Sequence, residues 1–295
     1  SNTIKIKTMA KLSNIRIGRA TSSEIYVVTS QGKTKGSIGT PFFTYLEKCR
    51  KERFFKQNIE NSVEVLAFSW GKLCEVIVHD MLPFNYEFHS DETTAHPKNK
   101  SWAGSTDGTI KREVLKKVIV DTITETKCPL TRNTFFDLIS ELYDFDGFDA
   151  VKKKEVNGND VIQKIRKNAK DGEKYYWQII SNACILNAKH GELIAFMPYF
   201  EQLDLIHEYN NALDESFWFV ARAKEGELPF ILKESGVENL NIIRFEIPIE
   251  DKKMLETRMK IFDYVLNLSS IEYAEFMEAG EKIKFIETEV LKLIK

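Results

Sequence analysis

Residues 121–129 read Asp-Thr-Ile-Thr-Glu-Thr-Lys-Cys-Pro, a β-branched run that predicts a buried strand yet contains two charges, Glu125 and Lys127. Side chains two residues apart on a strand project from the same face, so this strand holds a carboxylate and an ammonium side by side. A sheet interior tolerates such a pair only where a metal, a partner group or solvent compensates for the lost hydration. The run therefore predicts either a metal-assisted site or a salt bridge on a solvated sheet face.

Asp107, in the segment Gly104-Ser-Thr-Asp-Gly108, supplies a further carboxylate upstream of this strand. Asp followed at a distance by Glu-x-Lys is the minimal signature of nucleases that hydrolyse phosphodiesters with bound Mg²⁺. That reaction needs a nucleophilic water, neutralisation of charge on the phosphoryl oxygens and support for the leaving alkoxide, and carboxylate-held divalent ions supply all three. Because Asp, Glu and Lys are common residues, this spacing alone does not identify a nuclease.

The expected metal ligands are oxygen atoms, since Mg²⁺ prefers octahedral oxygen coordination and usually keeps several waters. Two or three carboxylates and one carbonyl then suffice. We expect Asp107, Glu125 and Glu75 to be these carboxylates, together with the backbone carbonyl of Thr126. Mn²⁺ is the expected substitute for Mg²⁺. Lys127 would orient the attacking water or help to deprotonate it.

The composition bounds the function without choosing it. With 295 residues, 43% of them hydrophobic, the chain can bury a full core, and its net charge of −2 means that a nucleic acid would have to be held by a local basic patch. The four cysteines form no C-x-x-C pair, which indicates neither a zinc ribbon nor a disulfide framework and favours a reducing interior. No run has the length of a membrane span or the apolar block of a signal peptide. We expect no membrane contact and a cytoplasmic location.

No internal repeat or low-complexity linker interrupts the sequence, so residues 1–295 are expected to form a single domain. Helical signals cover residues 21–30, 42–55, 63–81, 135–143, 161–169, 175–188, 201–213, 249–268 and 271–295, and strand signals cover 85–89, 102–110, 118–127, 191–198, 217–221 and 242–247. The strands of residues 85–127 predict a mixed or antiparallel meander. Helices around a central sheet predict an α/β or α+β fold.

Four short segments in a fixed order strengthen the nuclease interpretation. They are Trp70-Gly-Lys-Leu-Cys-Glu75, Ser105-Thr-Asp-Gly108, Glu125-Thr-Lys-Cys-Pro129 and Tyr175-Tyr-Trp-Gln178, preceded by Arg16-Ile-Gly-Arg-Ala-Thr-Ser-Ser-Glu24. Together they resemble the lambda-type phage exonucleases, also called the YqaJ-like viral recombinase family, a branch of the PD-(D/E)xK nucleases. The resemblance covers roughly residues 14–200, and the segment at Glu125 is its firmest part.

The resemblance implies a restriction-endonuclease-like core and a 5′→3′ exonuclease that degrades one strand of duplex DNA from an end. The product would be a 3′ overhang for a single-strand annealing protein. The family also implies assembly into a trimeric ring and a location in the cytoplasm of a bacterial or phage-infected cell. By this resemblance Glu75, Asp107 and Glu125 bind the metal, and Lys127 assists the attacking water. Gln178 supports the catalytic lysine or the water. Arg16, Ser23 and Glu24 match positions near the 5′-phosphate.

The sequence also departs from the family pattern. Thr106 stands where the family usually has Pro, and because that Pro ligates nothing we expect the change to be tolerated. A helical insertion is expected around residues 130–172. It contains the basic runs 152–154 and 164–167, which are either DNA contacts or, more commonly for such runs, solvated faces. Residues 200–295 resemble the family only generically and are expected to form a strand and helix extension.

Two alternatives to this function stay open. One is a RecB- or Cas4-like nuclease of another polarity, although scattered cysteines do not supply the clustered thiolates of an iron–sulfur site. The other is a DNA-end-binding recombination scaffold without turnover, against which the presence of both Glu125 and Lys127 argues. Plainer interpretations also exist for single residues: Glu75 as an exposed helix residue, Gln178 as a packing contact, Tyr175 as a core residue and Arg16 as a surface charge.

Overall fold

A computed structural model describes residues 15–59, 66–89, 92–145, 151–213, 217–224 and 226–294. Its helices are α1 (Thr40–Phe55), α2 (Leu66–Met81), α3 (Arg132–Ile139), α4 (Gly158–Asn168), α5 (Gly172–Leu186), α6 (Leu203–Asn211), α7 (Trp218–Arg222), α8 (Ile249–Leu266), α9 (Ser270–Lys282) and α10 (Glu287–Leu293), with 3₁₀ turns η1 (Ser22–Val27), η2 (Ser140–Leu142), η3 (Phe200–Gln202) and η4 (Lys233–Ser235). Its strands are β1 (Ala20–Thr21), β2 (Tyr86–Phe88), β3 (Thr94–Ala95), β4 (Trp102–Gly104), β5 (Gly108–Val114), β6 (Lys117–Lys127), β7 (Tyr143–Asp144), β8 (Lys152–Lys153), β9 (His190–Phe196) and β10 (Leu240–Glu246).

The main sheet is mixed, with strand order β10-β9-β6-β5-β2. Strands β6 and β9 are parallel, and the other neighbouring pairs are antiparallel. The central strand β6 is the run that contains Glu125 and Lys127, so the expected α/β fold with a central mixed sheet flanked by helices is confirmed. A smaller sheet, β1-β4-β3, lies beside it.

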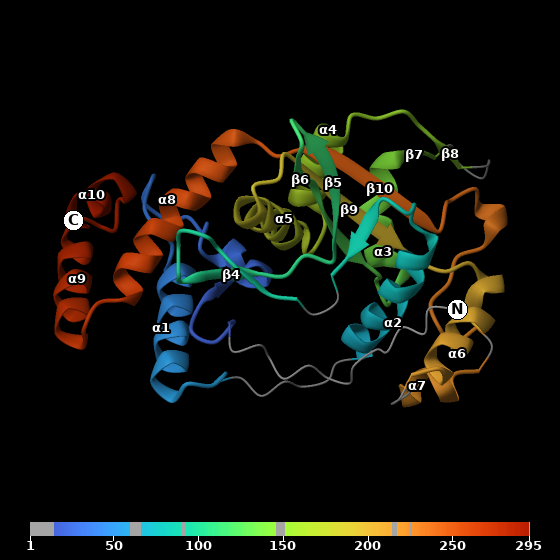
Figure 1. Cartoon of the computed structure of the whole chain (residues 1–295), viewed down its shortest axis with the longest axis horizontal. Helices are drawn as coiled ribbons and strands as arrows, with labels where there is room; N and C mark the ends of the chain where they lie inside the picture. Colours follow the sequence, from blue (N-terminus) through green and yellow to red (C-terminus); the bar gives the residue numbers. More distant parts are fainter. Residues whose placement is uncertain are drawn as a thin grey trace.

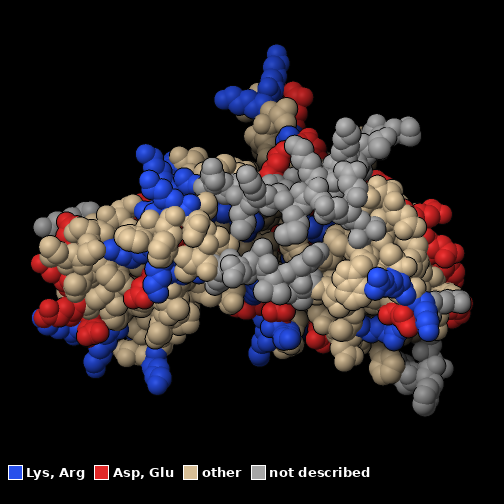
Figure 2. Space-filling model, turned by 90° about the horizontal axis from the view of Figure 1, so that it is seen from below, with Lys and Arg blue, Asp and Glu red and all other residues tan. Residues whose placement is uncertain are grey.

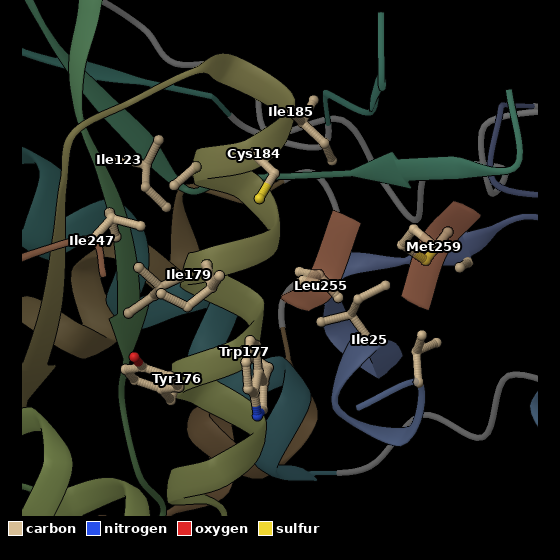
Figure 3. Packing of buried hydrophobic residues seen from close by; sticks show 14 of the residues in the cluster. Ile25, Ile123, Tyr176, Trp177, Ile179, Cys184, Ile185, Ile247, Leu255 and Met259 are labelled. Carbon is tan, nitrogen blue, oxygen red and sulfur yellow. The ribbon is translucent and has the colours of Figure 1, made fainter. Parts of the chain in front are cut away.

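Helices cover both faces of this sheet. On one face α5 packs on β6 and β9, where Ile123 and Leu193 join Ile179 in the larger hydrophobic core. On the other face Leu73 of α2 and Phe196 of β9 belong to a second hydrophobic core. Figure 1 shows α5 between the sheet and the pair α1 and α8, and Figure 3 shows its side chains pointing both ways. The site residues on α2 and α5 are therefore brought to the sheet from opposite sides.

The close approach of α5 to the sheet depends on a glycine. A Cβ atom at Gly191 in β9 would lie 2.4 Å from Cγ2 of Ile179 and 3.0 Å from the ring of Phe245. A larger residue would push the helix away from the strand. The absence of a side chain at this position thus sets the depth at which α5 sits on the sheet.

The segment 102–110 was predicted as one strand, and this is wrong. It forms β4 and β5, which belong to different sheets, and the chain turns between them at residues 105–107. Packing explains the break, because a Cβ atom at Gly104 would lie 2.2 Å from Oγ of Ser22 and 2.3 Å from Oδ1 of Asn182. Tertiary contacts therefore hold β4 against η1 and α5, and Asp107 falls in the turn that leads back to the main sheet.

Two further predictions in the C-terminal part are wrong. Residues 217–221, predicted as a strand, fall at the helix α7, because the buried Asn210 accepts from the N–H of Phe217 at 2.8 Å and donates to its carbonyl at 3.3 Å. Both main-chain groups are thereby withdrawn from sheet pairing.

The long helix predicted over residues 271–295 is divided into α9 and α10. The chain between them has positive φ at Lys284 (54°) and Phe285 (48°). The Phe285 N–H donates to the Gly280 carbonyl at 2.8 Å, and its ring lies 4.3 Å from the ring of Phe43. This contact with α1 ends α9 where periodicity alone would continue it. No helix among the described residues is long and apolar enough to cross a membrane.

Candidate active site

The expected catalytic residues meet at the carboxyl end of β6. Gly108 in β5 is paired with Thr124 in β6, so Asp107, one residue earlier, lies beside Glu125 and Thr126. Oδ2 of Asp107 accepts a hydrogen bond from the Thr126 N–H at 2.6 Å. A main-chain donor of this kind fixes a carboxylate in place. The turn that the strand prediction missed is thus the feature that presents Asp107.

Glu125 is the most buried member of the site, with 1% of its surface exposed. Its Oε1 atom accepts from Nζ of Lys127 at 2.6 Å and also from Nε2 of Gln178. Its Oε2 atom is fully buried and has no hydrogen-bond partner among the described residues. A buried carboxylate oxygen without a donor is costly, so one oxygen of Glu125 is left for a ligand.

Gln178 and Tyr175 are one helical turn apart on α5 and both contact this pair of charges. Nζ of Lys127 lies 4.8 Å from the centre of the Tyr175 ring, within the range of a cation–π interaction. Tyr175 also packs, partly buried, against the larger hydrophobic core, as the interpretation of it as a core residue predicts, but that interpretation does not include its contact with Lys127. The signal that could have revealed its role is its spacing of three from Gln178, which puts both side chains on one face of the helix.

Glu75 approaches from the opposite side of the sheet, on α2. It lines a small pocket together with Asp107 and Thr126. It is half-buried, which differs from the plainer expectation of an exposed helix residue. The structure therefore brings Glu75, Asp107, Glu125, Lys127 and Gln178 to one place.

Burial and neighbouring charges shift the pKa values of these groups. Burial and the neighbouring Asp107 raise the pKa of Glu125 to about 8, and burial and Asp107 also raise the pKa of Glu75 well above its usual range. Burial raises the pKa of Asp107 as well. Burial acts to lower the pKa of Lys127, but the carboxylates of Glu125 and Asp107 outweigh it and raise that pKa. Lys127 is therefore an ammonium, and one cation among three carboxyl groups leaves room for further positive charge.

These observations fit a divalent cation held by few protein ligands. Asp107 precedes Gly108 of β5 and Glu125 follows Thr124 of β6, the two residues that are paired, and the partnerless Oε2 of Glu125 is a free oxygen donor. Within the described ranges, no three residues of the His, Cys, Asp and Glu types are grouped so that together they could hold a metal ion. Mg²⁺ commonly binds through one or two carboxylates and keeps waters, so the donor set suits it.

The N-terminal residues expected near a 5′-phosphate are partly brought together. A guanidinium nitrogen of Arg16 lies 3.4 Å from Oγ of Ser23, which in turn lies 3.3 Å from Oγ1 of Thr21. Glu24 instead forms an ion pair with Lys48 on α1 at 3.3 Å. Arg16 and Ser23 thus form a donor pair, whereas the carboxylate of Glu24 is engaged by α1.

Ser22 ties this N-terminal segment to the active-site helix. It is 1% exposed, and its Oγ lies 2.7 Å from Oγ of Ser181 on α5. Nε1 of Trp102 donates to the same Ser181 oxygen at 2.8 Å. Because Ser181 follows Gln178 by one turn, the Arg16 and Ser23 pair is anchored to the helix that supports Glu125.

The basic runs 152–154 and 164–167 are largely paired within the chain. Lys164 lies 2.7 Å from Glu141, Arg166 lies 2.6 Å from Glu173, and Lys154 lies 3.4 Å from Asp144. On the face drawn in Figure 2, Lys and Arg side chains are interspersed with acidic ones. These pairings favour the interpretation of the runs as solvated faces.

Comparison with known proteins gives matches among solved structures alone. No family model matches the chain, and no curated protein matches it. An alkaline exonuclease (LHK-Exo) from Laribacter hongkongensis aligns over 91% of this chain and 96% of its own, with 14% identity and a TM-score of 0.49. The same enzyme in complex with dAMP aligns over 92% and 98%, with 13% identity and a TM-score of 0.49. A phage-related exonuclease from Haemophilus somnus 129PT aligns over 83% and 93%, with 13% identity and a TM-score of 0.48.

Proposed function

We propose that this protein is a Mg²⁺-dependent deoxyribonuclease that degrades linear duplex DNA from its ends. The observation that carries the proposal is the arrangement of Glu125, whose one oxygen is held by Lys127 and Gln178 while the other, buried beside Asp107, has no partner among the described residues. Such a site combines free oxygen donors with a fixed ammonium. Those are the elements that phosphodiester hydrolysis requires.

The side chains have separable roles in this proposal. Asp107 and Glu125 would hold the metal, with Glu75 and the carbonyl of Thr126 near it, and the bound ion would supply activation of water and stabilisation of charge on the phosphate. Lys127 orients the attacking water or stabilises the charge that develops on the phosphate. Gln178 keeps Glu125 in the orientation that leaves Oε2 free.

A catalytic role is favoured over a scaffold without turnover. Burying a carboxylate and an ammonium together is costly, and replacing such a pair with apolar residues is often neutral or stabilising. A DNA-binding scaffold has no need of this pair in a sheet interior. A nuclease needs both charges, which supports the enzymatic proposal.

The polarity we propose is 5′→3′, on the basis of Arg16 and Ser23. A guanidinium and a hydroxyl suit a terminal phosphate, which has one more oxygen and more charge than an internal diester. The product would be duplex DNA with 3′ overhangs, the substrate of a single-strand annealing protein, and a trimeric ring around the duplex remains part of the proposal from the family resemblance.

The decisive experiment is incubation of the purified protein with matched linear and circular duplexes, in Mg²⁺, Mn²⁺ or EDTA. We expect mononucleotide release from the linear form alone and none in EDTA. A duplex labelled at either strand end gives the polarity. Cleavage of the circle would replace the exonuclease proposal with an endonuclease, and cleavage unaffected by EDTA would contradict the metal assignment.

The Glu125→Gln variant provides the matched control for this experiment. It keeps the size of the side chain and its acceptor oxygen for Lys127 but removes a negative charge. We expect it to bind DNA and not to degrade it. If the variant degraded linear DNA at the wild-type rate, the activity would come from a contaminant or from another site.

A further inference from the structure

The hairpin of β5 and β6 extends well beyond the rest of the main sheet. Strand β2 pairs with β5 only as far as Ile110, and β9 pairs with β6 only from Thr122. Between these points, residues 111–121 form a two-stranded ribbon with no neighbouring strand among the described residues. Every residue from 111 to 118 is exposed. Free ribbons of this kind are marginally stable and leave both edges open, so a chain retains one at a cost.

The turn at the tip of the ribbon is also energetically unfavourable. Leu115 and Lys116, the two central residues, have positive φ values of 50° and 62°. Two-residue hairpin turns with positive φ at both positions strongly prefer Asn-Gly, and a branched Leu in the left-handed region is rare. Backbone strain of this sort often marks a functional segment. Leu115 and Lys116 therefore make this turn less stable than Asn-Gly would, which indicates that their side chains have a function.

Those side chains are apolar and basic. Leu115 is 93% exposed and Val118 is 70% exposed. Lys116 and Lys117 lie beside them and have no ion-pair partner among the residues that the structure describes, in a chain whose net charge is −2. A local concentration of unpaired cations on an acidic chain complements a polyanion.

The base of the ribbon is braced against the sheet. A register shift after Ile110 leaves Asp121 out of the ladder. Asp121 is 6% exposed, and its carboxylate contacts three nitrogen-bearing side chains. They are Arg112 of the ribbon at 2.7 Å, His190 of β9 at 3.0 Å and Arg244 of β10 at 3.2 Å. Side chains from three strands thus contact one carboxylate at the point where the ribbon leaves the sheet. These contacts fix the direction of the ribbon, which is called the arm below.

We propose that the tip of this ribbon is a second contact for duplex DNA, remote from the active site. This inference rests on the proposed nuclease function. Lys116 and Lys117 contact phosphates, and Leu115 enters the minor groove, where apolar side chains of other DNA-binding proteins insert between base steps. Leu115 is seven positions beyond Gly108, so the tip lies up to about 23 Å from the site, or about seven base pairs along a duplex.

The first test measures binding of a 5′-phosphorylated duplex of about 20 base pairs by fluorescence anisotropy in Ca²⁺, from about 50 to about 200 mM KCl. Each lysine that contacts a phosphate contributes about 0.9 to the slope of log K against log salt. The double variant Lys116→Gln and Lys117→Gln should lower that slope by about 1.8. Lys282→Gln on α9, at the left end of the molecule in Figure 1 and away from the β5–β6 hairpin, is the control and should leave the slope unchanged.

The second test separates a DNA contact from a merely structural turn. The variant Leu115→Asn with Lys116→Gly has the turn sequence that this backbone prefers, so its Tm should rise by about 2 °C whatever the tip does. If the tip contacts DNA, the same variant should bind the 20-base-pair duplex more weakly. Opposite changes in Tm and in affinity support the proposal, and a rise in Tm with unchanged affinity overturns it.

Duplex length gives the third test. On stem-loop DNA with a stem of about five base pairs, shorter than the reach of the arm, the tip variants should bind like the wild type. An equal loss of affinity on short and long stems would mean that the tip does not contact remote DNA. Self-association that the tip variants abolish, with DNA binding intact, would assign the arm to a second copy of this chain. If the wild type itself neither bound nor cleaved DNA, the proposed function would fail, an outcome distinct from these.

Discussion

The ammonium of Lys127 and the carboxylate of Glu125 lie on the same face of β6, 2.6 Å apart, and are directed toward α5. Gln178 donates to the same carboxylate oxygen, and the ring of Tyr175 lies against the ammonium. The pair is therefore held by a strand on one side and by one helical turn on the other. Its fixed geometry is what makes the roles of the individual residues testable.

Lys127→Ala should lower the rate of DNA degradation by about 10²–10⁴-fold, as the loss of general acid–base or electrostatic assistance typically does. Binding of DNA ends in Ca²⁺ should change far less. Lys127→Arg keeps the charge but spreads it over a larger planar group beside Tyr175, so rescue should be poor. Single-turnover kinetics and anisotropy measure the two effects. An equal loss of binding and of cleavage would make Lys127 a phosphate anchor.

Asp107→Ala should reduce Mg²⁺-dependent cleavage by more than about 100-fold, because it removes a metal ligand and leaves the Thr126 N–H without its acceptor. Mn²⁺ should support the wild type and Ca²⁺ should bind without fast cleavage, since the smaller ions enforce a stricter geometry. Calorimetric titration with each ion gives the affinities. Wild-type cleavage by the Asp107→Ala variant in Mg²⁺ would refute the metal assignment.

Without metal, the protein should lose stability as pH rises from about 5 to about 8. The pKa of Glu125 is about 8 in the folded state, against about 4.3 when unfolded, so the folded state holds a proton that the unfolded state has released in this range. The contribution of Glu125 to stability is complete below its pKa in the unfolded state. It is lost as pH rises toward its pKa in the folded state. Tm measured in EDTA across this range checks the slope.

Glu125→Gln is the control for that measurement, because an amide does not titrate. Its Tm should depend less on pH than that of the wild type. Saturating Mg²⁺ should also reduce the loss at high pH, since the ion replaces the proton between the carboxylates. The same pH slope in the wild type and in Glu125→Gln would show that other groups govern it.

A 5′-phosphate should accelerate degradation relative to a 5′-hydroxyl, and Arg16→Ala should erase the difference. Arg16 and Ser23 present a guanidinium and a hydroxyl within 3.4 Å of each other. Lys100→Ala, a change at another basic residue, is the control and should preserve the preference. Initial rates on duplexes that differ only at the 5′ end test this. Equal wild-type rates on both would remove the basis for the assignment of Arg16.

Arg258→Ala should destabilise the protein by about 3 kcal/mol, because truncating one partner of a buried pair leaves the other groups unpaired. Arg258 is 1% exposed, pairs with Glu287 and donates to the Ser30 carbonyl at 3.1 Å. It thus joins α8, α10 and the loop after η1. Urea unfolding measures the loss of unfolding free energy. Lys282→Ala, which removes an exposed ion pair, is the comparison and should cost about 0.5 kcal/mol or less. A similar small effect for Arg258→Ala would mean that this junction contributes little.

Local sequence determined which chemical groups the site contains. The run at residues 121–129 predicted a strand by its β-branched residues, and the strand period of two put Glu125 and Lys127 on one face. The helices that bear Glu75 and Gln178 followed from apolar periodicity. These features depend on neighbours in the chain, which is why they could be predicted. The mixed sheet flanked by helices followed from the same signals.

Tertiary contacts decided how the site residues come together and where helices and strands end. The turn that presents Asp107 exists because Gly104 is packed against Ser22 and Asn182, which come from segments far away along the chain in both directions. Residues 217–221 fail to form a strand because Asn210 binds the main chain of Phe217, and α9 ends where Phe285 meets Phe43. Propensity and periodicity contain no information on such contacts. The sequence by itself thus determined which charged groups are present, and long-range packing determined where each of them stands.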